Sequence, residues 1–530
     1  MEKRDLWHFI KEFEQTGELH RISTKVSTEL EITEIVDRIV KSKNDNKALL
    51  FENNGSEFPL LINLFGTEKR MASIFGVSHL NDIGKEIEEI FKSLTTPRQS
   101  FFDKLKLLPQ LKEFASWMPK SVSGRGICQQ NVMKNPDLSI FPILKCWPAD
   151  GGKFITLPLV HTKDPETGNR NLGMYRMQIF DEKTTGMHWH IHKGGAAHFE
   201  KYKKLKKQMP VAVALGGDPV YSYVATAPLP DDVDEYILAG FLRKKRVELV
   251  KCLTQDLEVP ADCDIVIEGF VDPEENLAWE GPFGDHTGFY SLPDWYPKFH
   301  VTAITYKNNA VYPTTVVGIP PQEDAWLGKA TERIFLPLIK QTLLPEIVDM
   351  NLPFAGVAHN LSVISLKKRF PGHAWKVAHS LWGAGQMMFN KVMITVDSDV
   401  DVNNYSQVAE AVLSNCDFDE DLYFSQGNLD VLDHAARKKV FGGKLLIDAT
   451  RKTKNLPEEI AEYSMAEEIG FHITEFLQGH VLFVKTEKSD KPLPEIWQNF
   501  KSQILKLGGI KIIVFSDIPV TADEPEFLVW

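Results

Sequence analysis

The hydrophobic pattern of the first 120 residues predicts a small unit that mixes helices and strands. Apolar side chains recur every three to four positions over 5–18 and again over 29–42, as on one face of an amphipathic helix. The stripe of the first helix consists of Leu6, Phe9, Ile10 and Phe13. The short apolar runs KALLF and FPLLINLF are typical of strands. We therefore expect an α/β domain over residues 1–120.

The region from about 126 to 320 has a different pattern. Short apolar runs with strand character alternate there with glycine, proline and aspartate. These runs are ITLPLVHT, GMYRMQIF, VAVALGG, KFHVTAITY and AVYPTTVVG. Short strands at this spacing favour a barrel or a sandwich. We expect a second, mainly β domain over 121–322.

The last third of the chain returns to a mixed pattern. The segment EDAWLGKATERIFLPLIKQTL, 323–343, predicts a long helix that serves as a linker over 323–349. Strand-like SVISLKK and MITVDSDVD then alternate with helical segments, so we expect an α/β domain over 350–530. Near its end, LPEIWQNFKSQILKLG predicts a helix and IKIIVF a strand.

Composition and charge exclude several classes of protein. The chain has 530 residues, of which 43% are hydrophobic, and a net charge of -12, so a basic surface for nucleic acid is not expected. The N-terminal MEKRDLWHFIKEFEQ lacks an apolar signal-peptide core, and no apolar run has the length of a bilayer span. Five scattered cysteines fit a reducing compartment. We expect a cytoplasmic protein without a transmembrane segment.

Two carboxylates stand out in WEGPFGDHTGFY, 279–290. Glu280 and Asp285 are separated by Gly-Pro-Phe-Gly, which neither a helix interior nor a regular strand accommodates. A turn or a bent strand end therefore carries both carboxylates into an aromatic setting. Without further information, the simpler hypothesis is that they accept hydrogen bonds from turn amides.

Three histidines lie in the segment Met187 to His192, which we predict to be extended. Alternate residues of a strand share a face, so His188, His190 and His192 would project together and could bind a metal. The simpler alternative, which we prefer, is that some of these rings are exposed or hydrogen-bonded. His198 follows the flexible pair Gly194-Gly195, which permits close approach to a ligand.

Further candidates are Asn171 and Arg176, which flank Gly173, and Glu235. An arginine can hold a carboxylate through two parallel hydrogen bonds, although an ordinary ion pair is more common. Glu235 opens a helix directly after an acidic cluster, whose aspartates are explained by helix capping.

Together these motifs resemble the UbiD family of reversible decarboxylases of aromatic and acrylic acids. The resemblance runs in order from about residue 5 to about 450. The motifs are NLGMYRMQ (171–178), TTGMHWHIHKGGA (184–196), LEVPADCDIVIEG (257–269) and EGPFGDHTGFY (280–290), supported by DGGKFIT (150–156), VALGGDP (213–219) and PGHAWKV (371–377). One motif alone would be weak, whereas four in order are specific.

The resemblance implies an architecture. It consists of an N-terminal α/β domain, a central flavin-reductase-like split β-barrel that binds the cofactor, a linker helix, and a C-terminal α/β oligomerisation domain with a C-terminal extension. The active site would lie between the barrel and the C-terminal domain. Family members form dimers or hexamers, so we expect a homo-oligomer.

The resemblance also implies cofactors. UbiD-like enzymes use prenylated FMN, which a separate flavin prenyltransferase supplies, with Mn²⁺ or Mg²⁺ at its phosphate and often K⁺ nearby. The family's metal ligands fall on Asn171, His192 and Glu235. Cofactor contacts fall on Asn171, Met174, Tyr175, Arg176, His188, Trp189, His190, Lys193, Gly194 and Lys391.

The family's catalytic set falls on Glu280, Arg176 and Asp285. On this hypothesis Arg176 pairs with Glu280 and keeps it ionised. Asp285 donates a proton to carbon, and an apolar pocket would raise its pKa and keep it protonated.

The expected reaction is non-oxidative decarboxylation of an aromatic or α,β-unsaturated acid. The leading substrate is 4-hydroxy-3-polyprenylbenzoate or a related ubiquinone or menaquinone precursor, and a polyprenyl tail would bring peripheral membrane contact. The alternative substrate is a soluble phenolic acid such as 4-hydroxybenzoate or vanillate. Two other classes stay open: an FMN oxidoreductase, and a non-catalytic flavin-binding assembly protein.

Overall fold

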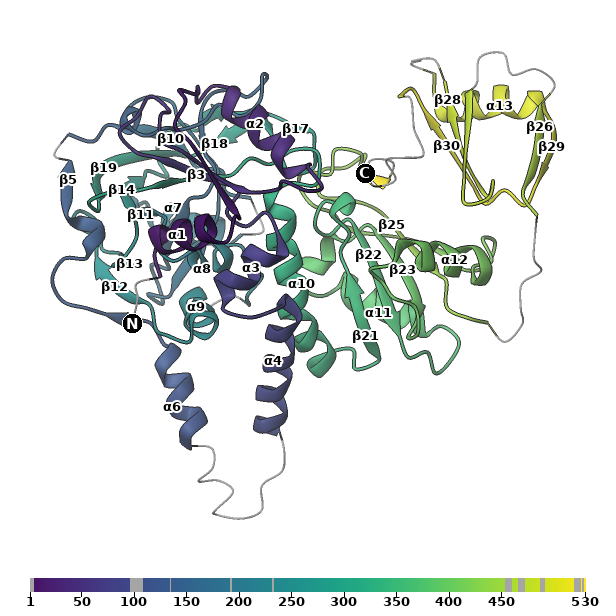
Figure 1. Cartoon of the computed structure of the whole chain (residues 1–530), viewed down its shortest axis with the longest axis horizontal. Helices are drawn as coiled ribbons and strands as arrows, with labels where there is room; N and C mark the ends of the chain where they lie inside the picture. The colour runs from purple at the N-terminus through teal and green to yellow at the C-terminus, as the bar shows by residue number, and fades with distance from the viewer. Residues whose placement is uncertain are drawn as a thin grey trace. The chain divides into compact units, whose positions relative to one another are not determined.

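The chain divides into two compact units, Met1–Pro337 and Leu338–Trp530. The computed structural model describes residues 4–95, 108–133, 135–190, 193–230, 233–452, 460–465, 472–486, 491–518, 526 and 529–530. The division falls inside helix α10, Glu323–Thr342 (Figure 1). The presence of α10 confirms the predicted long helix. The domain boundaries at residues 120, 322 and 349 stay predictions.

The N-terminal segment contains both predicted helices, α1 (Leu6–Gln15) and α2 (Glu31–Val40). The apolar stripe of α1 is buried, as its periodicity predicts. Four short strands form a sheet in the order β1-β2-β3-β20. Their bounds are β1 Leu19–Ile22, β2 Ala48–Phe51, β3 Leu60–Ile62 and β20 Tyr312–Pro313. Because β20 comes from the end of the central segment, hydrogen bonds join that segment to the N-terminal sheet.

A large antiparallel sheet forms the middle of the first unit, in the order β10-β19-β14-β11-β7-β8, with β5 also paired to β19. Figure 1 labels five of these strands: β5, β10, β11, β14 and β19. The strands are β5 Asn131–Met133, β7 Leu159–Lys163, β8 Arg170–Gly173, β10 Thr184–Gly186, β11 Met209–Leu215, β14 Ile265–Val271 and β19 Lys298–Tyr306. Across the described residues, no pairing between β10 and β8 closes this sheet. A mixed α/β fold is therefore established, whereas the predicted split barrel is not confirmed.

The first unit contains further helices and small sheets. The helices are α3 Glu68–Phe75, α4 Leu80–Thr95, α6 Leu108–Trp117, α7 Gly194–Leu205, α8 Val220–Val224 and α9 Glu235–Arg243. The remaining strands are β4 Lys120–Ser121, β6 Phe154–Ile155, β9 Met177–Gln178, β12 Glu248–Lys251 and β13 Glu258–Pro260, with four more at the candidate site.

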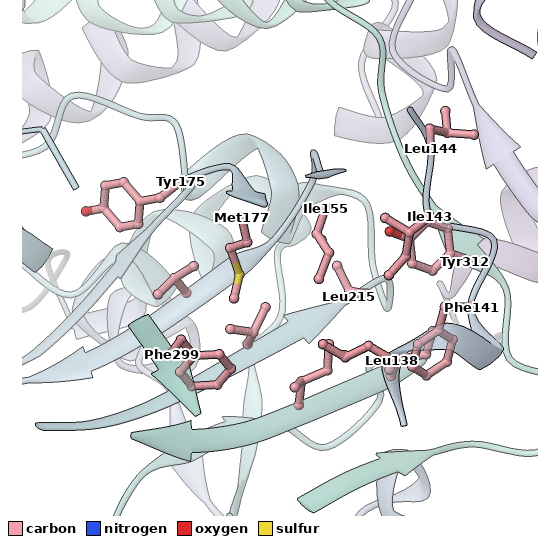
Figure 2. Close-up of a cluster of buried hydrophobic side chains, with 14 of the residues drawn as sticks. Leu138, Phe141, Ile143, Leu144, Ile155, Tyr175, Met177, Leu215, Phe299 and Tyr312 are labelled. Carbon is pink, nitrogen blue, oxygen red and sulfur yellow. The ribbon is translucent and has the colours of Figure 1, made fainter. Parts of the chain in front are cut away.

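One buried apolar cluster joins the elements that carry the candidate site. Figure 2 shows Met177 beside Ile155, its partner across the β6–β9 pair, and Leu215 and Phe299 belong to the same cluster. Tyr175 belongs to the same cluster, so the segment next to Arg176 is anchored in the core. Close packing of this kind restricts where the neighbouring polar side chains can point.

The second unit contains a five-stranded sheet in the order β21-β22-β23-β25-β24, as predicted for an α/β segment. The elements are β21 Ile347–Asn351, β22 Leu361–Leu366, α11 His373–Trp382, β23 Val392–Asp397, α12 Tyr405–Asn415, β24 Leu422–Asn428 and β25 Phe441–Asp448. Helix α12 packs on β23 and β25, and its apolar residues join the core of this sheet.

The last segment of the second unit forms separate small sheets, β26-β29 and β27-β28-β30. Their elements are β26 Glu462–Met465, β27 His472–Phe476, β28 Val481–Lys485, α13 Leu493–Gln503, β29 Ile504–Gly508 and β30 Ile512–Ser516. The predicted strand is confirmed, but the predicted helix over 493–508 is wrong in its second part. Residues 504–508 pair with β26 instead.

Two expectations drawn from composition can be compared with the structure. All five cysteines are free thiols. Across the described parts of the chain, no helix combines the length and apolar character that crossing a membrane requires.

Candidate active site

Arg176 lies in the break between strands β8 and β9, and its guanidinium has three oxygen partners. Nε donates to Glu280 Oε1 at 3.0 Å, Nη1 donates to Asp285 Oδ2, and Nη2 donates to Ser291 Oγ at 3.0 Å. The guanidinium also stacks on the ring of Phe283, 4.8 Å from its centroid. The predicted contact between Arg176 and Glu280 is thus present, and a second carboxylate shares the same cation.

Short strands deliver the two carboxylates. Glu280 ends β15, Ala278–Glu280, and Asp285 directly follows β16, Phe283–Gly284. These strands pair with β18, Asp294–Tyr296, and β17, Tyr290–Ser291, respectively. Gly281 between them has a φ of 96°, a backbone conformation that residues with a Cβ rarely adopt. The expected bent connection is therefore confirmed, and it brings both carboxylates to one guanidinium.

Two polar side chains hold this connection in place. Gln178 Oε1 accepts from the Gly281 amide at 2.7 Å, and Asp150 Oδ1 accepts from the Gly284 amide at 2.7 Å. Sequence reasoning did not single out these residues, nor Ser291. Gln178 and Asp150 lie inside motifs that carried the family resemblance, and Ser291 directly follows one. Their position in the motifs was the available signal.

The predicted protonation state of Asp285 is wrong for the protein without substrate. Burial opposes ionisation, but the hydrogen bond from His286 Nδ1 at 3.0 Å and the charge of Arg176 outweigh it. The pKa of Asp285 therefore lies well below its ordinary value. Asp285 Oδ1 also accepts from the His286 amide at 2.8 Å, so the simpler role as a turn acceptor holds as well.

Glu280 is ionised for a similar reason. Its side chain is 0% exposed, and this burial alone would raise its pKa. The hydrogen bond with His188 and the charge of Arg176 outweigh burial, so the pKa of Glu280 is lowered. Two anions and one cation thus share a buried site.

The histidine segment does not form the predicted strand. Strand β10 ends at Gly186, and Met187–His190 is irregular, held by the bond from the Met187 amide to the Pro297 carbonyl at 2.9 Å. Even so, His188 and His190 are neighbours, with their Nε2 atoms 2.7 Å apart. His192 lies outside the described residues. Among the residues that the structure describes, no group of three His, Cys, Asp or Glu side chains could hold a metal.

Asn171 and Glu235, the other two predicted metal ligands, come close through strand β8. The Leu172 amide, next to Asn171, donates to Glu235 Oε2 at 3.0 Å. Burial raises the pKa of Glu235 to about 7. Asp234 caps helix α9 by accepting from the Tyr236 amide, as expected, whereas Asp231 and Asp232 of the same acidic cluster lie outside the described residues. The carboxylate of Glu235 and the carboxamide of Asn171 are oxygen donors of the type that Mg²⁺ and Mn²⁺ prefer.

The N-terminus of helix α7 adjoins Asn171. A Cβ on Gly194 would lie 2.1 Å from Asn171 Oδ1, so a larger residue fits there only if Asn171 or the start of α7 moves. The Gly195 amide donates to the Tyr175 hydroxyl at 3.3 Å. Trp189 Nε1 is buried without a hydrogen-bond partner among the described residues. Helix α7 begins directly after Lys193, and the Trp189 Nε1–H group is a donor available for a further bond. A helix N-terminus of this kind suits an anionic group such as a phosphate.

Met174 and Lys391, two further predicted cofactor contacts, have other partners in the structure. Met174 is half-buried, and its amide donates to the Ala225 carbonyl at 3.1 Å. Lys391 belongs to the second unit, where its Nζ lies 2.6 Å from Asp433 Oδ2. The assignment of both residues to cofactor binding stays a prediction.

Comparisons with known proteins show which family the chain resembles. Domain models of one family match the chain: the 3-octaprenyl-4-hydroxybenzoate carboxy-lyase N-terminal domain over 10–88, Rift-related domain over 120–320 and C-terminal domain over 325–449. A protein from Aquifex aeolicus (strain VF5) is 50% identical over 452 residues, which is 85% of this chain and 92% of its own.

Two solved structures are also similar. The UbiD-class enzyme HmfF from Pelotomaculum thermopropionicum, in complex with FMN, has a TM-score of 0.72 and 25% identity, covering 86% of this chain and 95% of its own. The closed form of vanillic acid decarboxylase from Sedimentibacter hydroxybenzoicus has a TM-score of 0.74 and 25% identity, covering 95% and 99%. The chain therefore belongs to the UbiD family, and it is a carboxy-lyase.

Proposed function

We propose that this protein releases CO₂ from an aromatic carboxylic acid with the help of prenylated FMN. The observation that carries the proposal is the buried guanidinium of Arg176, shared by Glu280 and Asp285. Loss of CO₂ from a carboxylate leaves a carbon that needs a proton, so a site for this reaction needs both an anion-binding cation and an acid. Arg176 and Asp285 fit these two roles.

The region around Asn171 fits the flavin phosphate and its metal. Asn171, Glu235 and, by family resemblance, His192 would hold Mn²⁺ or Mg²⁺, with K⁺ nearby. The N-terminus of α7 and the unused Trp189 donor support an anionic neighbour. When bound, prenylated FMN supplies the electron sink that decarboxylation at an sp² carbon requires. The FMN bound to the similar HmfF structure supports a flavin cofactor here.

The proton transfer follows from the competition for Arg176. Asp285 is ionised while Arg176 and His286 hold it. A substrate carboxylate that binds Arg176 would weaken the contact with Asp285, and the pKa of the buried carboxyl would then rise. Asp285 could take up a proton and deliver it to the substrate carbon. Glu280 keeps Arg176 in place throughout, because both of its oxygens are engaged.

The relatives support two candidate substrates. The family models take their name from 3-octaprenyl-4-hydroxybenzoate carboxy-lyase, which favours a polyprenylated 4-hydroxybenzoate or a related quinone precursor. The similarity to vanillic acid decarboxylase favours a soluble phenolic acid as the alternative. We further propose a homo-oligomer and a flavin prenyltransferase as the source of the cofactor.

The cofactor can be tested directly. The protein would be co-expressed with a flavin prenyltransferase and purified in the dark with Mn²⁺. The mass of the released cofactor would then be measured by mass spectrometry. A mass of prenylated FMN is expected. Unmodified FMN despite an active prenyltransferase would favour the oxidoreductase or the flavin-binding assembly-protein hypothesis, and no flavin at all would contradict the proposed flavin-dependent reaction.

A further inference from the structure

We propose that His188 is a positioning residue that fixes the orientation of the Glu280 carboxylate through its Nδ1–H group. The family resemblance assigned His188 to the cofactor, whereas its contacts point to the catalytic carboxylate. The inference rests on the proposed function, because it gives His188 a part in that reaction.

The direction of the hydrogen bond follows from the charge of its acceptor. His188 Nδ1 contacts Glu280 Oε2 directly. An ionised carboxylate can only accept hydrogen bonds, and the surroundings keep Glu280 ionised. Nδ1 must therefore carry the proton and donate it to Oε2.

The rest of the ring is equally constrained. Burial, and then the charge of Arg176, lower the pKa of His188, so the ring is neutral and Nε2 has a lone pair. His190 Nε2, 2.7 Å away, must then donate to His188 Nε2. The ring centroids of His188 and Tyr296 are 4.1 Å apart. Packing and hydrogen bonding thus select one tautomer and one ring orientation.

The two oxygens of Glu280 consequently have separate partners. Oε1 accepts from Arg176 Nε at 3.0 Å, and Oε2 accepts from His188. Without His188, a buried charged oxygen would lose its donor, which is unfavourable enough to turn or protonate the carboxylate. Arg176 would then lose the fixed partner that holds it against the substrate.

Three variants separate this role from general packing. Asn at position 188 places an amide N–H at the position of Nδ1, Gln places one near Nε2, and Leu supplies none. We expect His188→Leu and His188→Gln to lower kcat about 10- to 100-fold with little change in KM, as for other residues that orient a catalytic group. His188→Asn should restore most of the activity. His300→Leu removes a different histidine–glutamate pair, with Glu275, and should leave CO₂ release unchanged.

The readouts are kcat and KM for CO₂ release by the flavin-loaded proteins, together with flavin content from absorbance. Flavin content should be the same in all variants. The inference is overturned if His188→Asn is as impaired as His188→Leu, or if activity falls only in proportion to flavin content. A wild-type protein that contains prenylated FMN yet decarboxylates no acid would instead refute the proposed function, and the role of His188 with it.

Discussion

At the residue scale, one guanidinium organises the site. Arg176 donates to Glu280, Asp285 and Ser291, which lie more than 100 positions away in the sequence. The planar fork of arginine can serve several oxygens at once, whereas the single ammonium of lysine cannot match that geometry. The arrangement therefore depends on the shape of the side chain as well as on its charge.

Arg176→Lys should lower kcat/KM for CO₂ release by about 10²-fold or more, because it removes donors aimed at reacting groups. Ser291→Ala is the matched control, because it removes only one neutral acceptor. It should lower kcat/KM roughly fivefold, which corresponds to about 1 kcal/mol. Steady-state assays of both flavin-loaded variants provide the comparison. Equal losses in the two variants would contradict the special role of the Arg176–carboxylate contacts.

Sequence motifs predicted Arg176, Glu280 and Asp285 as a group, and the structure brings them together. The ionisation of Asp285 was not predictable in the same way. An apolar, aromatic sequence suggested a raised pKa, but the hydrogen bond from His286 and the charge of Arg176, which is 109 positions away, lower it. The contact between His188 and Glu280 also depends on folding rather than on local pattern.

At the element scale, the proposed metal and cofactor region involves strand β8 and the N-terminus of helix α7. Gly194 lies so close to Asn171 Oδ1 that no side chain can be added without movement. The backbone there is therefore as much a part of the site as the polar side chains.

Gly194→Ala should reduce both metal and flavin content, because its Cβ would displace Asn171 or the start of α7. Gly328→Ala is the control: it lies in helix α10 with nothing within 4 Å of the added Cβ, and should stabilise the protein by about 0.5–1 kcal/mol. Manganese per chain and flavin absorbance would be measured for both. Wild-type occupancy in Gly194→Ala would contradict the assignment of this region.

A buried histidine in strand β7 predicts acid sensitivity. His161 bonds the Tyr236 hydroxyl at 2.6 Å and the Ala212 carbonyl at 3.1 Å, and burial, helped by the charge of Arg170, lowers its pKa to about 3. In the unfolded chain this histidine has an ordinary pKa near 6.5, so the unfolded state binds the proton first as the pH falls. The free energy of unfolding therefore decreases between about pH 6.5 and pH 3.

The wild-type protein should therefore lose its stability advantage over His161→Asn on acidification, by up to about 1.4 kcal/mol per pH unit. Urea denaturation of both proteins between pH 8 and pH 5 would measure this difference. A difference that stays constant over the range would show that His161 is not the buried neutral group described here.

Elements with strong helical periodicity, such as α1, α2 and α10, were predictable from sequence. Two segments were not. Met187–His190 alternates like a strand but is held by single contacts to distant loops, and 504–508 has helical apolar spacing but pairs with β26. In both cases tertiary contacts outweighed the local pattern.

At the scale of the whole molecule, the pattern of apolar and polar residues predicted the succession of α/β, β and α/β segments. It could not predict that β20 would pair with β3, which joins the end of the central segment to the N-terminal sheet. Nor did it predict the small sheets after residue 460. Such pairings depend on long-range contacts that carry no signal in a short window of sequence.

The segment after residue 460 has its own apolar cluster around Leu482, Val484 and Phe500, and the family models end at residue 449. A chain that ends after Lys452 should therefore still bind flavin at the wild-type ratio. The cofactor content of the shortened and full-length proteins would be compared. Complete loss of flavin from a shortened protein with a normal melting transition would assign this segment a part in cofactor binding.

The most direct test of the account is CO₂ release by the protein loaded with prenylated FMN. Wild type and Asp285→Asn would be assayed together against a panel of aromatic acids that includes prenylated and unprenylated 4-hydroxybenzoates and vanillate. The account predicts CO₂ release from at least one acid by the wild type, and its loss in Asp285→Asn with flavin content unchanged. Equal CO₂ release by the two proteins would contradict the assignment of the proton donor and of the site built around Arg176.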